Sequence, residues 1–175
     1  IEKGLADPKK VGLIGHSFGG YETDLIITQT DRFATAVSGA AWTDLISSYL
    51  YVGATFRRPD FYRAEHDQLR IGKSLFEDTE SYLKSSPVLQ AVNVTTPLLG
   101  WTGEQDRHIH SLQSMEFYMA LRRLGKVHTL LVYPEEEHNL EKRKNQKDLT
   151  KRIEEWFDYY LKNGKQEQWM KSDFQ

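Results

Sequence analysis

The sequence predicts an α/β fold, in which the strands of a parallel sheet alternate with helices. Short apolar or β-branched segments recur along the chain, and segments with helical periodicity lie between them. The clearest helix lies at residues 147–163 and ends before Gly164. Its predicted apolar face comprises Leu149, Ile153, Trp156, Phe157 and Tyr160. Strands that are joined through helices pair in parallel, so this order of segments predicts one parallel sheet.

Four segments are expected to form the strands. They lie at residues 11–14, 33–41, 94–101 and 127–133. The first is a continuous apolar run, which is typical of a strand that is buried on both faces. The second consists mainly of small and β-branched residues. Pro97 introduces the third strand, and Pro134 closes the fourth.

The intervening segments are expected to be helical. A helix should follow the first strand, with Tyr21, Leu25 and Thr28 at near-helical spacing. Residues 42–84 are rich in aromatic and charged side chains and should form short helices. Residues 111–124 have the pattern of an amphipathic helix. Its inward side chains are expected to be Leu112, Met115, Met119 and Leu124.

The composition limits the class of protein. A length of 175 residues suffices for one domain with its own core. The formal net charge is −2, so nothing indicates binding to nucleic acid or to an anionic membrane. The chain has no cysteine, which excludes disulfides, a cysteine nucleophile and a thiolate metal site. We expect neither a metal ion nor a cofactor.

No segment reaches the length of a membrane span, and the first ten residues do not have the pattern of a signal peptide. They are charged and contain Gly4 and Pro8. Because the first residue is not methionine, the sequence leaves the cellular compartment undetermined.

The first candidate functional residue is Ser17, within the pattern Gly-x-Ser-x-Gly at residues 15–19. A serine on a tight turn between a strand and a helix adopts strained backbone angles, and the flanking glycines let both elements pack closely. An apolar strand is predicted before this pattern and a helix after it, which indicates a nucleophile elbow. A glycine-rich turn without a ligand is the alternative. A Walker phosphate loop is disfavoured, because no Lys-Ser/Thr pair follows.

A nucleophilic serine needs a base, and the base needs a carboxylate to orient it. In folds with a nucleophile elbow, the acid and then the base follow the serine along the chain. His138 lies in a predicted loop shortly after Tyr133 and is therefore the best candidate base. We expect the other histidines to be surface or packing residues. They are His16, His66, His108, His110 and His128.

Asp106 is the matching candidate acid. It follows residues 98–103, where a predicted strand runs into a loop, so it should lie at the same edge of the sheet as the elbow. Glu104 is the alternative acid. Glu136 and Glu137 precede His138 directly and are expected to shape its loop instead.

Several longer motifs resemble the prolyl-oligopeptidase group of serine peptidases, most closely its dipeptidyl-peptidase and acylaminoacyl-peptidase branches. The resemblance extends over about residues 9–162. It includes the elbow at residues 15–21 (GHSFGGY) and the acid loop at residues 103–106 (GEQD). The other matching segments are residues 31–34 (DRFA), 36–37 (AV), 86–87 (SP), 96–99 (TPLL), 120–125 (ALRRLG) and 133–138 (YPEEEH).

The resemblance implies an α/β-hydrolase fold and cleavage of peptide bonds in short peptides by acyl transfer. It implies that Ser17 attacks the substrate, that His138 moves the proton and that Asp106 holds the imidazole. The backbone N–H of Phe18 is expected to donate to the oxyanion, and the Phe18 ring is expected to border the substrate pocket. Three further aromatic residues are candidates for the pocket or for core packing. They are Trp42, Tyr49 and Tyr51.

Two features depart from the family pattern. Asn139 follows the candidate base where the family usually has glycine, and asparagine tolerates a left-handed backbone. The complete fold has several strands before the elbow, whereas this chain has room for one. Residues 1–175 are therefore expected to be the C-terminal part of a catalytic domain, with about four strands and flanking helices and with the upstream strands missing. Such a chain should self-associate or pair with a missing upstream segment.

Two other functions stay open at this stage. An esterase or lipase-like hydrolase would use the same three catalytic residues, and only the wider resemblance favours peptide substrates. The second is a non-catalytic fragment that serves as an interaction module. Neither the amino-acid preference nor the exo or endo mode of cleavage follows from these residues.

Overall fold

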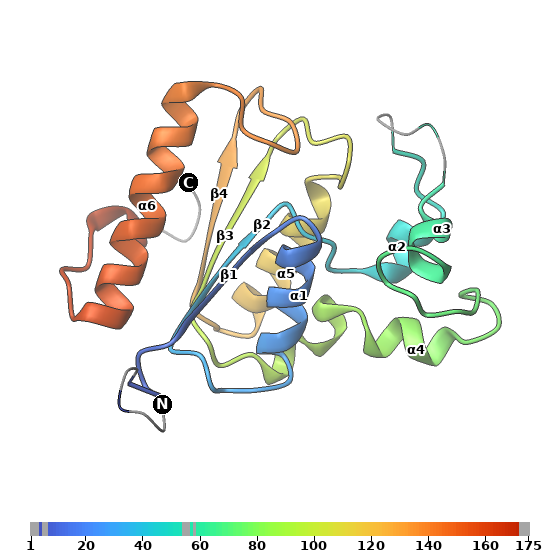
Figure 1. The fold of residues 1–175 in the computed structure, drawn as a ribbon, viewed down its shortest axis with the longest axis horizontal. Coiled ribbons are helices and arrows are strands. Elements are labelled where there is room, and N and C mark those ends of the chain that lie inside the picture. The colour runs from blue at the N-terminus through green and yellow to red at the C-terminus, as the bar shows by residue number, and fades with distance from the viewer. Residues whose placement is uncertain (1–3, 5–6, 54–56, 58, 172–175) are drawn as a thin grey trace.

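The computed structural model describes residue 4, residues 7–53, residue 57 and residues 59–171 of the chain. Its centre is a sheet of four strands in the order β1-β2-β3-β4 (Figure 1). All three neighbouring pairs are parallel. The strands are β1 (Gly12–His16), β2 (Thr35–Gly39), β3 (Leu98–Gly103) and β4 (His128–Tyr133). The predicted α/β fold with about four parallel strands is therefore confirmed.

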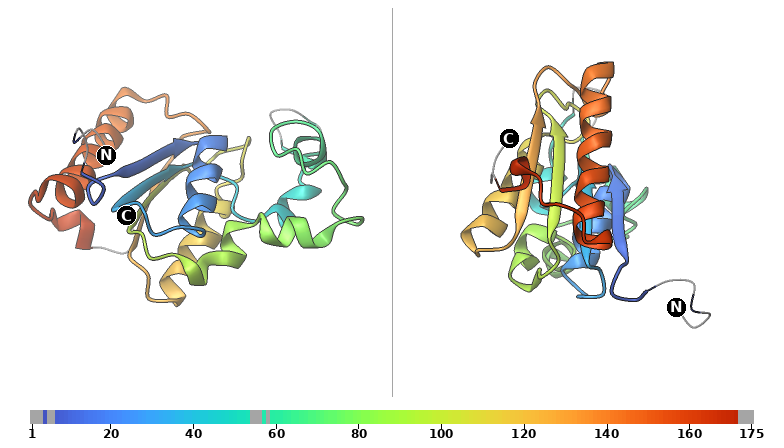
Figure 2. Two further views of the ribbon diagram at one scale, coloured as in Figure 1. Left: turned by 60° about the horizontal axis from the view of Figure 1, so that its bottom comes forward. Right: turned by 90° about the vertical axis from the view of Figure 1, so that its left-hand side faces the viewer.

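Helices cover both faces of the sheet (Figures 1 and 2). Helices α1 (Phe18–Ile27) and α5 (Leu112–Arg123) lie on one face, and α6 (Arg143–Lys162) lies on the other. Because successive strand residues point to opposite faces, each inner strand contributes to two cores. The core beneath α6 includes Val37, Leu99, Trp101, Leu131, Tyr133, Leu149 and Trp156. The core beneath α1 and α5 includes Ile27, Ala36, Leu98, Phe117 and Leu121.

Helix α6 is the longest helix, with 20 residues, and it begins before the predicted residue 147. Its predicted apolar stripe does pack against the sheet. The helix ends because Asn163 has a left-handed backbone with φ 56°, and the N–H of Gly164 donates to the carbonyl of Asp158 at 2.9 Å. A short 3₁₀ helix, η2 (Gln168–Lys171), follows. In the part of the chain that the structure describes, no helix is both long and apolar enough to cross a membrane.

The predicted inward face of α5 is wrong for three of its four residues, whereas Met115 is half-buried. Leu112, Met119 and Leu124 are exposed by 58%, 54% and 44%. The buried residues of the helix are instead Gln113, Phe117, Tyr118 and Leu121. Phe117 and Leu121 lie one turn apart and pack into the core beneath α1 and α5. The predicted stripe left out Phe117, and the true stripe is therefore rotated around the helix axis.

The described residues between 42 and 84 form the short helices that the sequence predicts. They are α2 (Leu45–Tyr49), α3 (Phe61–Glu65) and α4 (Thr79–Lys84), and a 3₁₀ helix, η1 (Pro87–Asn93), follows. The carboxylate of Asp44 caps α2 by accepting hydrogen bonds from the N–H groups of Ile46 and Ser47. The ring of Tyr49 packs edge-on against Tyr82, with centroids 5.3 Å apart. These helices project beside the sheet, beyond the end of β2 (Figure 1).

Two titratable side chains are buried beneath the face that α1 and α5 cover. Asp24 is 2% exposed, and its Oδ2 accepts a hydrogen bond from the Oγ–H of Ser38 at 2.9 Å. Its Oδ1 and both ring nitrogens of His128 have no hydrogen-bond partner among the described residues. Burial raises the pKa of Asp24 well above its usual value, and burial lowers the pKa of His128 to about 3. The fold thus favours the uncharged form of both side chains.

We predict that Asp24→Asn stabilises the protein, and more so as the pH rises. Below the usual aspartate pKa of 3.8, Asp24 is protonated in both the folded and the unfolded state. Above it, the unfolded state releases the proton more readily, so ionisation favours unfolding. Asparagine does not ionise, so the variant should gain about 1–3 kcal/mol near pH 8. Each kcal/mol raises the melting temperature by about 2–4 °C in a domain of this size.

Melting curves at about pH 4 and about pH 8 test this prediction. Glu22→Gln is the matched control, because Glu22 lies on the same helix but is exposed. The control should leave the melting temperature unchanged at both pH values. A gain for Asp24→Asn that is equal at both pH values would show that ionisation of Asp24 does not limit stability.

Candidate active site

Ser17 occupies the turn between β1 and α1. Its backbone has φ 60° and ψ −121°, which few non-glycine residues adopt, and its N–H donates to the carbonyl of Gly39 at 2.8 Å. A Cβ on Gly15 would lie 1.9 Å from the carbonyl oxygen of Gly19, and a Cβ on Gly20 would lie 2.6 Å from that of Gly39. These two glycines therefore allow the close approach of α1 to the sheet. A Cβ on Gly19 would meet nothing within 4 Å, so packing does not require this glycine.

The structure brings Ser17, His138 and Asp106 together. The Oγ–H of Ser17 donates to Nε2 of His138 at 2.8 Å, and Nδ1–H of His138 donates to Oδ2 of Asp106 at 2.8 Å. The three residues follow β1, β4 and β3, at the carboxyl end of the sheet. This hydrogen-bond pattern leaves Nε2 free to accept a proton from the serine. The arrangement can therefore activate Ser17 as a nucleophile.

The carboxylate of Asp106 is fixed on both oxygens. Its side chain is fully buried, and Oδ1 accepts hydrogen bonds from the N–H groups of His108 at 2.8 Å and Ile109 at 2.9 Å. Oδ2 is thereby directed toward His138. The alternative acid, Glu104, is exposed. The loop after β3 thus orients the carboxylate without help from a ligand.

Glu136 holds the loop that carries His138. Its side chain is buried and accepts three hydrogen bonds from the segment before α6 and from the first turn of α6. The donors are the N–H groups of Glu141 and Lys142 and the Nδ2 of Asn145. The carbonyl of Glu136 accepts from the N–H of Gln105 at 2.9 Å, which links this loop to the loop of Asp106. The geometry fits the expectation that this glutamate shapes the loop of the candidate base.

The left-handed residue of this loop lies before the candidate base and not after it. Glu135 has φ 58°, whereas Asn139 has no positive φ. Asn139 therefore does not adopt the left-handed backbone that asparagine tolerates. The physical reason is that the chain reverses directly after β4, at residues 134–135, so the turn needs its left-handed residue there.

Two histidines that we expected to be packing residues lie against the ring of His138. The His108 ring stacks on it with centroids 4.4 Å apart, and the His16 ring lies 4.9 Å away. Burial lowers the pKa of both rings, and it lowers that of His108 to about 4, where repulsion by His138 and Arg63 adds to the effect. The sequence signal that could have identified them is their position beside Ser17 and Asp106.

The remaining histidines make contacts in other parts of the chain. His128 begins β4 and pairs with Leu98 at the start of β3, which is the opposite end of the sheet. Nε2 of His66 lies 3.4 Å from a carboxylate oxygen of its neighbour Glu65. Nδ1 of His110 accepts a hydrogen bond from the N–H of Leu112.

Phe18, the candidate oxyanion donor, directly follows Ser17 in the chain. It is the first residue of α1, so its N–H has no acceptor within the helix. Its half-buried ring packs on Tyr21 with centroids 5.7 Å apart. The N–H of Phe18 is thus next to Ser17 in the chain, while its ring packs on Tyr21.

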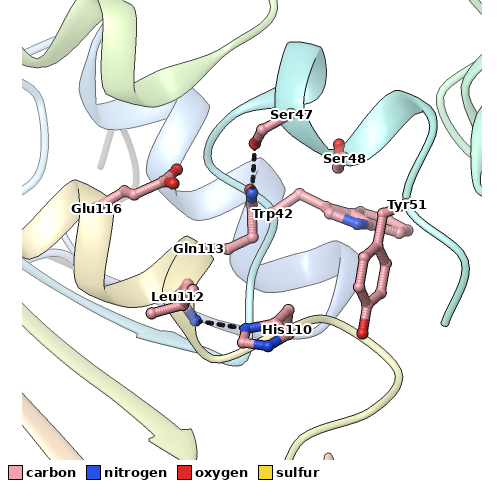
Figure 3. Close-up of a pocket in the computed structure, with 8 residues that line it drawn as sticks. All are labelled: Trp42, Ser47, Ser48, Tyr51, His110, Leu112, Gln113 and Glu116. Carbon is pink, nitrogen blue, oxygen red and sulfur yellow. Dashed lines mark hydrogen bonds between the residues drawn. The ribbon is translucent and has the colours of Figure 1, made fainter. Parts of the chain in front are cut away.

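The other three aromatic candidates differ in their surroundings. Trp42 and Tyr49 are buried, and the Tyr49 hydroxyl donates to Glu65. Tyr51 packs edge-on against His110, with centroids 5.8 Å apart. Trp42 and Tyr51 line a pocket of about 190 Å³ (Figure 3), and Tyr49 is not among its lining residues. The other lining residues are Ser47, Ser48, His110, Leu112, Gln113 and Glu116.

The fold and the site together define the class of this protein. A parallel sheet with a serine elbow after one strand and an acid and a base after later strands is the arrangement of an α/β-hydrolase fold. A sequence model described as the prolyl oligopeptidase family matches residues 1–164. The chain therefore belongs to the prolyl oligopeptidase family of serine peptidases.

Individual relatives agree with this assignment. The chain is 35% identical over 158 residues to the uncharacterized peptidase YuxL of Bacillus subtilis. The aligned region covers 89% of this chain and 23% of YuxL. It is 30% identical over 166 residues to the acylamino-acid-releasing enzyme of Arabidopsis thaliana, and the aligned region covers 93% of this chain and 21% of that enzyme. The solved structure of the acylaminoacyl peptidase of Pyrococcus horikoshii matches this chain with a TM-score of 0.75 at 28% identity. The match covers 93% of this chain and 26% of that peptidase chain. This chain thus spans about a quarter of the length of these relatives.

Proposed function

We propose that this chain is the C-terminal part of the catalytic domain of a serine peptidase that hydrolyses short peptides through an acyl-enzyme. The observation that carries the proposal is the continuous chain of hydrogen bonds from Ser17 through His138 to Asp106. Membership of a peptidase family supports peptide substrates over other acyl compounds. The name of the Arabidopsis relative describes the release of acylamino acids, which supports substrates that are built from amino acids.

In the proposed reaction, Oγ of Ser17 attacks the carbonyl carbon of the scissile peptide bond while Nε2 of His138 takes the hydroxyl proton. The carboxylate of Asp106 stabilises the resulting imidazolium. His138 then donates this proton to the leaving amine, and the acyl group stays on Ser17. Water next attacks the ester while His138 accepts one of its protons. His138 then returns this proton to Oγ of Ser17 as the bond to the acyl group breaks, and the carboxylic acid leaves. General acid–base catalysis of this kind contributes about 10²–10⁴-fold to the rate.

The proposed oxyanion donor on this chain is the N–H of Phe18. A backbone N–H in the first turn of a helix also lies in the favourable field of the helix dipole. We propose that the second donor lies upstream of the elbow strand, as the resemblance to the family implies. We further propose that the Phe18 ring borders the pocket for the residue before the scissile bond, with Trp42 and Tyr51 as additional candidates. The burial of Tyr49 against Tyr82 favours a packing role for that side chain.

A substrate panel tests the proposed function. The full-length protein is assayed with aminoacyl amides, dipeptidyl amides and simple esters that share one leaving group. We expect hydrolysis of the amides. Hydrolysis of the esters alone would indicate an esterase or lipase-like enzyme. No turnover, together with no labelling by a fluorophosphonate, would indicate a non-catalytic interaction module and would overturn the proposal.

The free edge of the sheet is the basis of a proposal about partners. Among the described residues, β1 pairs with β2 on one side only, and Ile14 in its middle is 56% exposed. Apolar edges of this kind recruit further strands. We propose that this edge pairs with an upstream segment in a longer chain, and with a second copy when residues 1–175 stand alone.

The isolated 175-residue chain should therefore self-associate and should hydrolyse dipeptidyl amides poorly. The loss of one oxyanion donor alone costs about 10²–10³-fold in rate. Sedimentation measures the association state, and the amide panel measures the rate relative to the full-length protein. A stable monomer with the full-length rate would refute both the edge proposal and the proposed upstream donor.

A further inference from the structure

A column of planar groups includes the ring of the candidate base. The Trp101 ring lies 5.1 Å from the His16 ring with 7° between their planes, and His16 lies 4.9 Å from His138. The closest stack of the column is that of His108 on His138, at 4.4 Å and 29°. Nη2 of Arg63 in turn lies 3.4 Å from Nε2 of His108. The imidazole of His138 therefore has ring neighbours as well as hydrogen-bond partners.

Hydrogen bonds hold both of these ring neighbours in place. Nε2–H of His16 donates to the carbonyl oxygen of His138 at 2.9 Å, so His16 also holds the backbone of the candidate base. The guanidinium of Arg63 donates to Nε2 of His108, so this nitrogen must carry a lone pair. The N–H of His108 donates to Oδ1 of Asp106. His108 is thus fixed both at its backbone and at the far edge of its ring.

Arg63 is itself rigidly placed. It is 5% exposed, although it carries a charge. Its Nη1 lies 3.5 Å from Oδ1 of Asp60, and its guanidinium carbon lies 4.0 Å from the centre of the Trp42 ring. A charged side chain that is buried in this way needs such partners. Arg63 therefore provides a firm support for His108 from the side of α3.

We propose that His108 is a positioning residue whose ring, supported by Arg63, keeps the imidazole of His138 in the plane that joins Ser17 to Asp106. The inference rests on the proposed function. The two hydrogen bonds of His138 lie on the edge of its ring, so they leave the ring able to tilt about the line between Nδ1 and Nε2. A ring stacked on its face opposes this tilt. His108 acts through His138 and does not itself take part in proton transfer.

The charges around His108 suit this role. Four groups influence its protonation: Arg63, His16, His138 and Asp106. Burial and the nearby Arg63 and His138 hold the pKa of His108 at about 4, so its ring is neutral near neutral pH. His138 becomes positively charged during the proposed reaction. A neutral ring tolerates this charge, whereas a protonated ring at 4.4 Å would repel it.

Two variants of the full-length protein test the inference, His108→Ala and His108→Phe. Phenylalanine keeps a planar ring for stacking and lacks the nitrogens, whereas alanine removes the ring. The probe is p-nitrophenyl acetate, whose acetyl group is too small to contact a side chain that binds the rest of a peptide. Rates are expressed per active site, counted by titration with a fluorophosphonate, so that misfolded protein does not enter the comparison.

We expect His108→Ala to slow acylation by p-nitrophenyl acetate about 10-fold to 10²-fold, because small misplacements of a catalytic group have effects of this size. His108→Phe should restore the rate to within about 3-fold of the unmodified protein. If His108→Ala hydrolyses p-nitrophenyl acetate at an unchanged rate, the inference is overturned. This holds even if the variant cleaves peptide amides more slowly, because His108 would then act by contacting the substrate. A slow His108→Phe variant would overturn it too, because the ring nitrogens would then be required. If the unmodified protein does not react with the fluorophosphonate, the proposed function fails instead.

Discussion

Ser17→Ala should remove nearly all hydrolysis of peptide amides by the full-length protein. Of the atoms in the proposed machinery, Oγ of Ser17 alone forms a covalent bond with the substrate, so no other group can replace it. Removal of a nucleophile from such a triad costs about 10⁴–10⁶-fold in rate. The turn should survive, because alanine keeps the Cβ and loses only a half-buried hydroxyl. Steady-state kinetics with a dipeptidyl amide measure the effect, and a melting curve confirms that the variant is folded.

Ser81→Ala is the matched control for this variant. Ser81 lies on α4, and its hydroxyl donates to the carboxylate of Asp78. Both variants lose one hydroxyl that makes a side-chain hydrogen bond, but Ser81 has no part in the proposed reaction. The control should keep the full rate. If Ser17→Ala retained more than a few per cent of the activity, with contaminating peptidase excluded, Ser17 would not be the nucleophile.

Asp106→Asn should lower kcat by about 10⁴-fold, although it changes the shape of the site very little. The reason lies in the donors that surround the carboxylate. Oδ1 accepts two backbone N–H groups, so the asparagine oxygen must occupy that position. The amide NH₂ then faces Nδ1 of His138 and forces the ring proton onto Nε2. In this tautomer His138 donates toward Ser17 and has no lone pair to accept the serine proton.

Glu104→Gln is the control for Asp106→Asn, since Glu104 is the alternative acid of the same loop and is exposed. It should leave kcat for a dipeptidyl amide unchanged. The pH dependence of kcat offers a second readout, because a tautomer defect lowers the rate at all pH values where the native enzyme is active. A large loss in Glu104→Gln with little loss in Asp106→Asn would reverse the assignment of the acid.

Much of the fold could be predicted from the sequence, because its signals are local. Residues 11–14 are apolar and precede a serine between glycines, which defines a strand, a turn and a helix together. The stripe of α6 is likewise continuous over several turns. The same local order placed Asp106 and His138 in loops after strands, and the structure brings both to Ser17. Their catalytic roles stay predictions until activity is measured.

The errors and omissions concern features that depend on tertiary packing. Which face of α5 is buried depends on how the helix is rotated against the sheet. The positions of the leucines and methionines in the sequence do not indicate that Phe117 and Leu121 are buried. The left-handed residue of the base loop depends on where the chain reverses after β4. The stack of His108 on His138 joins two loops that are 30 residues apart in sequence. No periodicity within either loop predicts such a contact.

The measurement that tests the central claim most directly is the site of covalent modification by a fluorophosphonate. The full-length protein is labelled, digested and mapped by tandem mass spectrometry, with a sample of His138→Ala labelled in parallel. We expect one adduct, on Oγ of Ser17, and slow labelling in the His138→Ala variant. An adduct on a different residue, or no adduct in a preparation that hydrolyses dipeptidyl amides, would contradict the claim that Ser17, His138 and Asp106 act together.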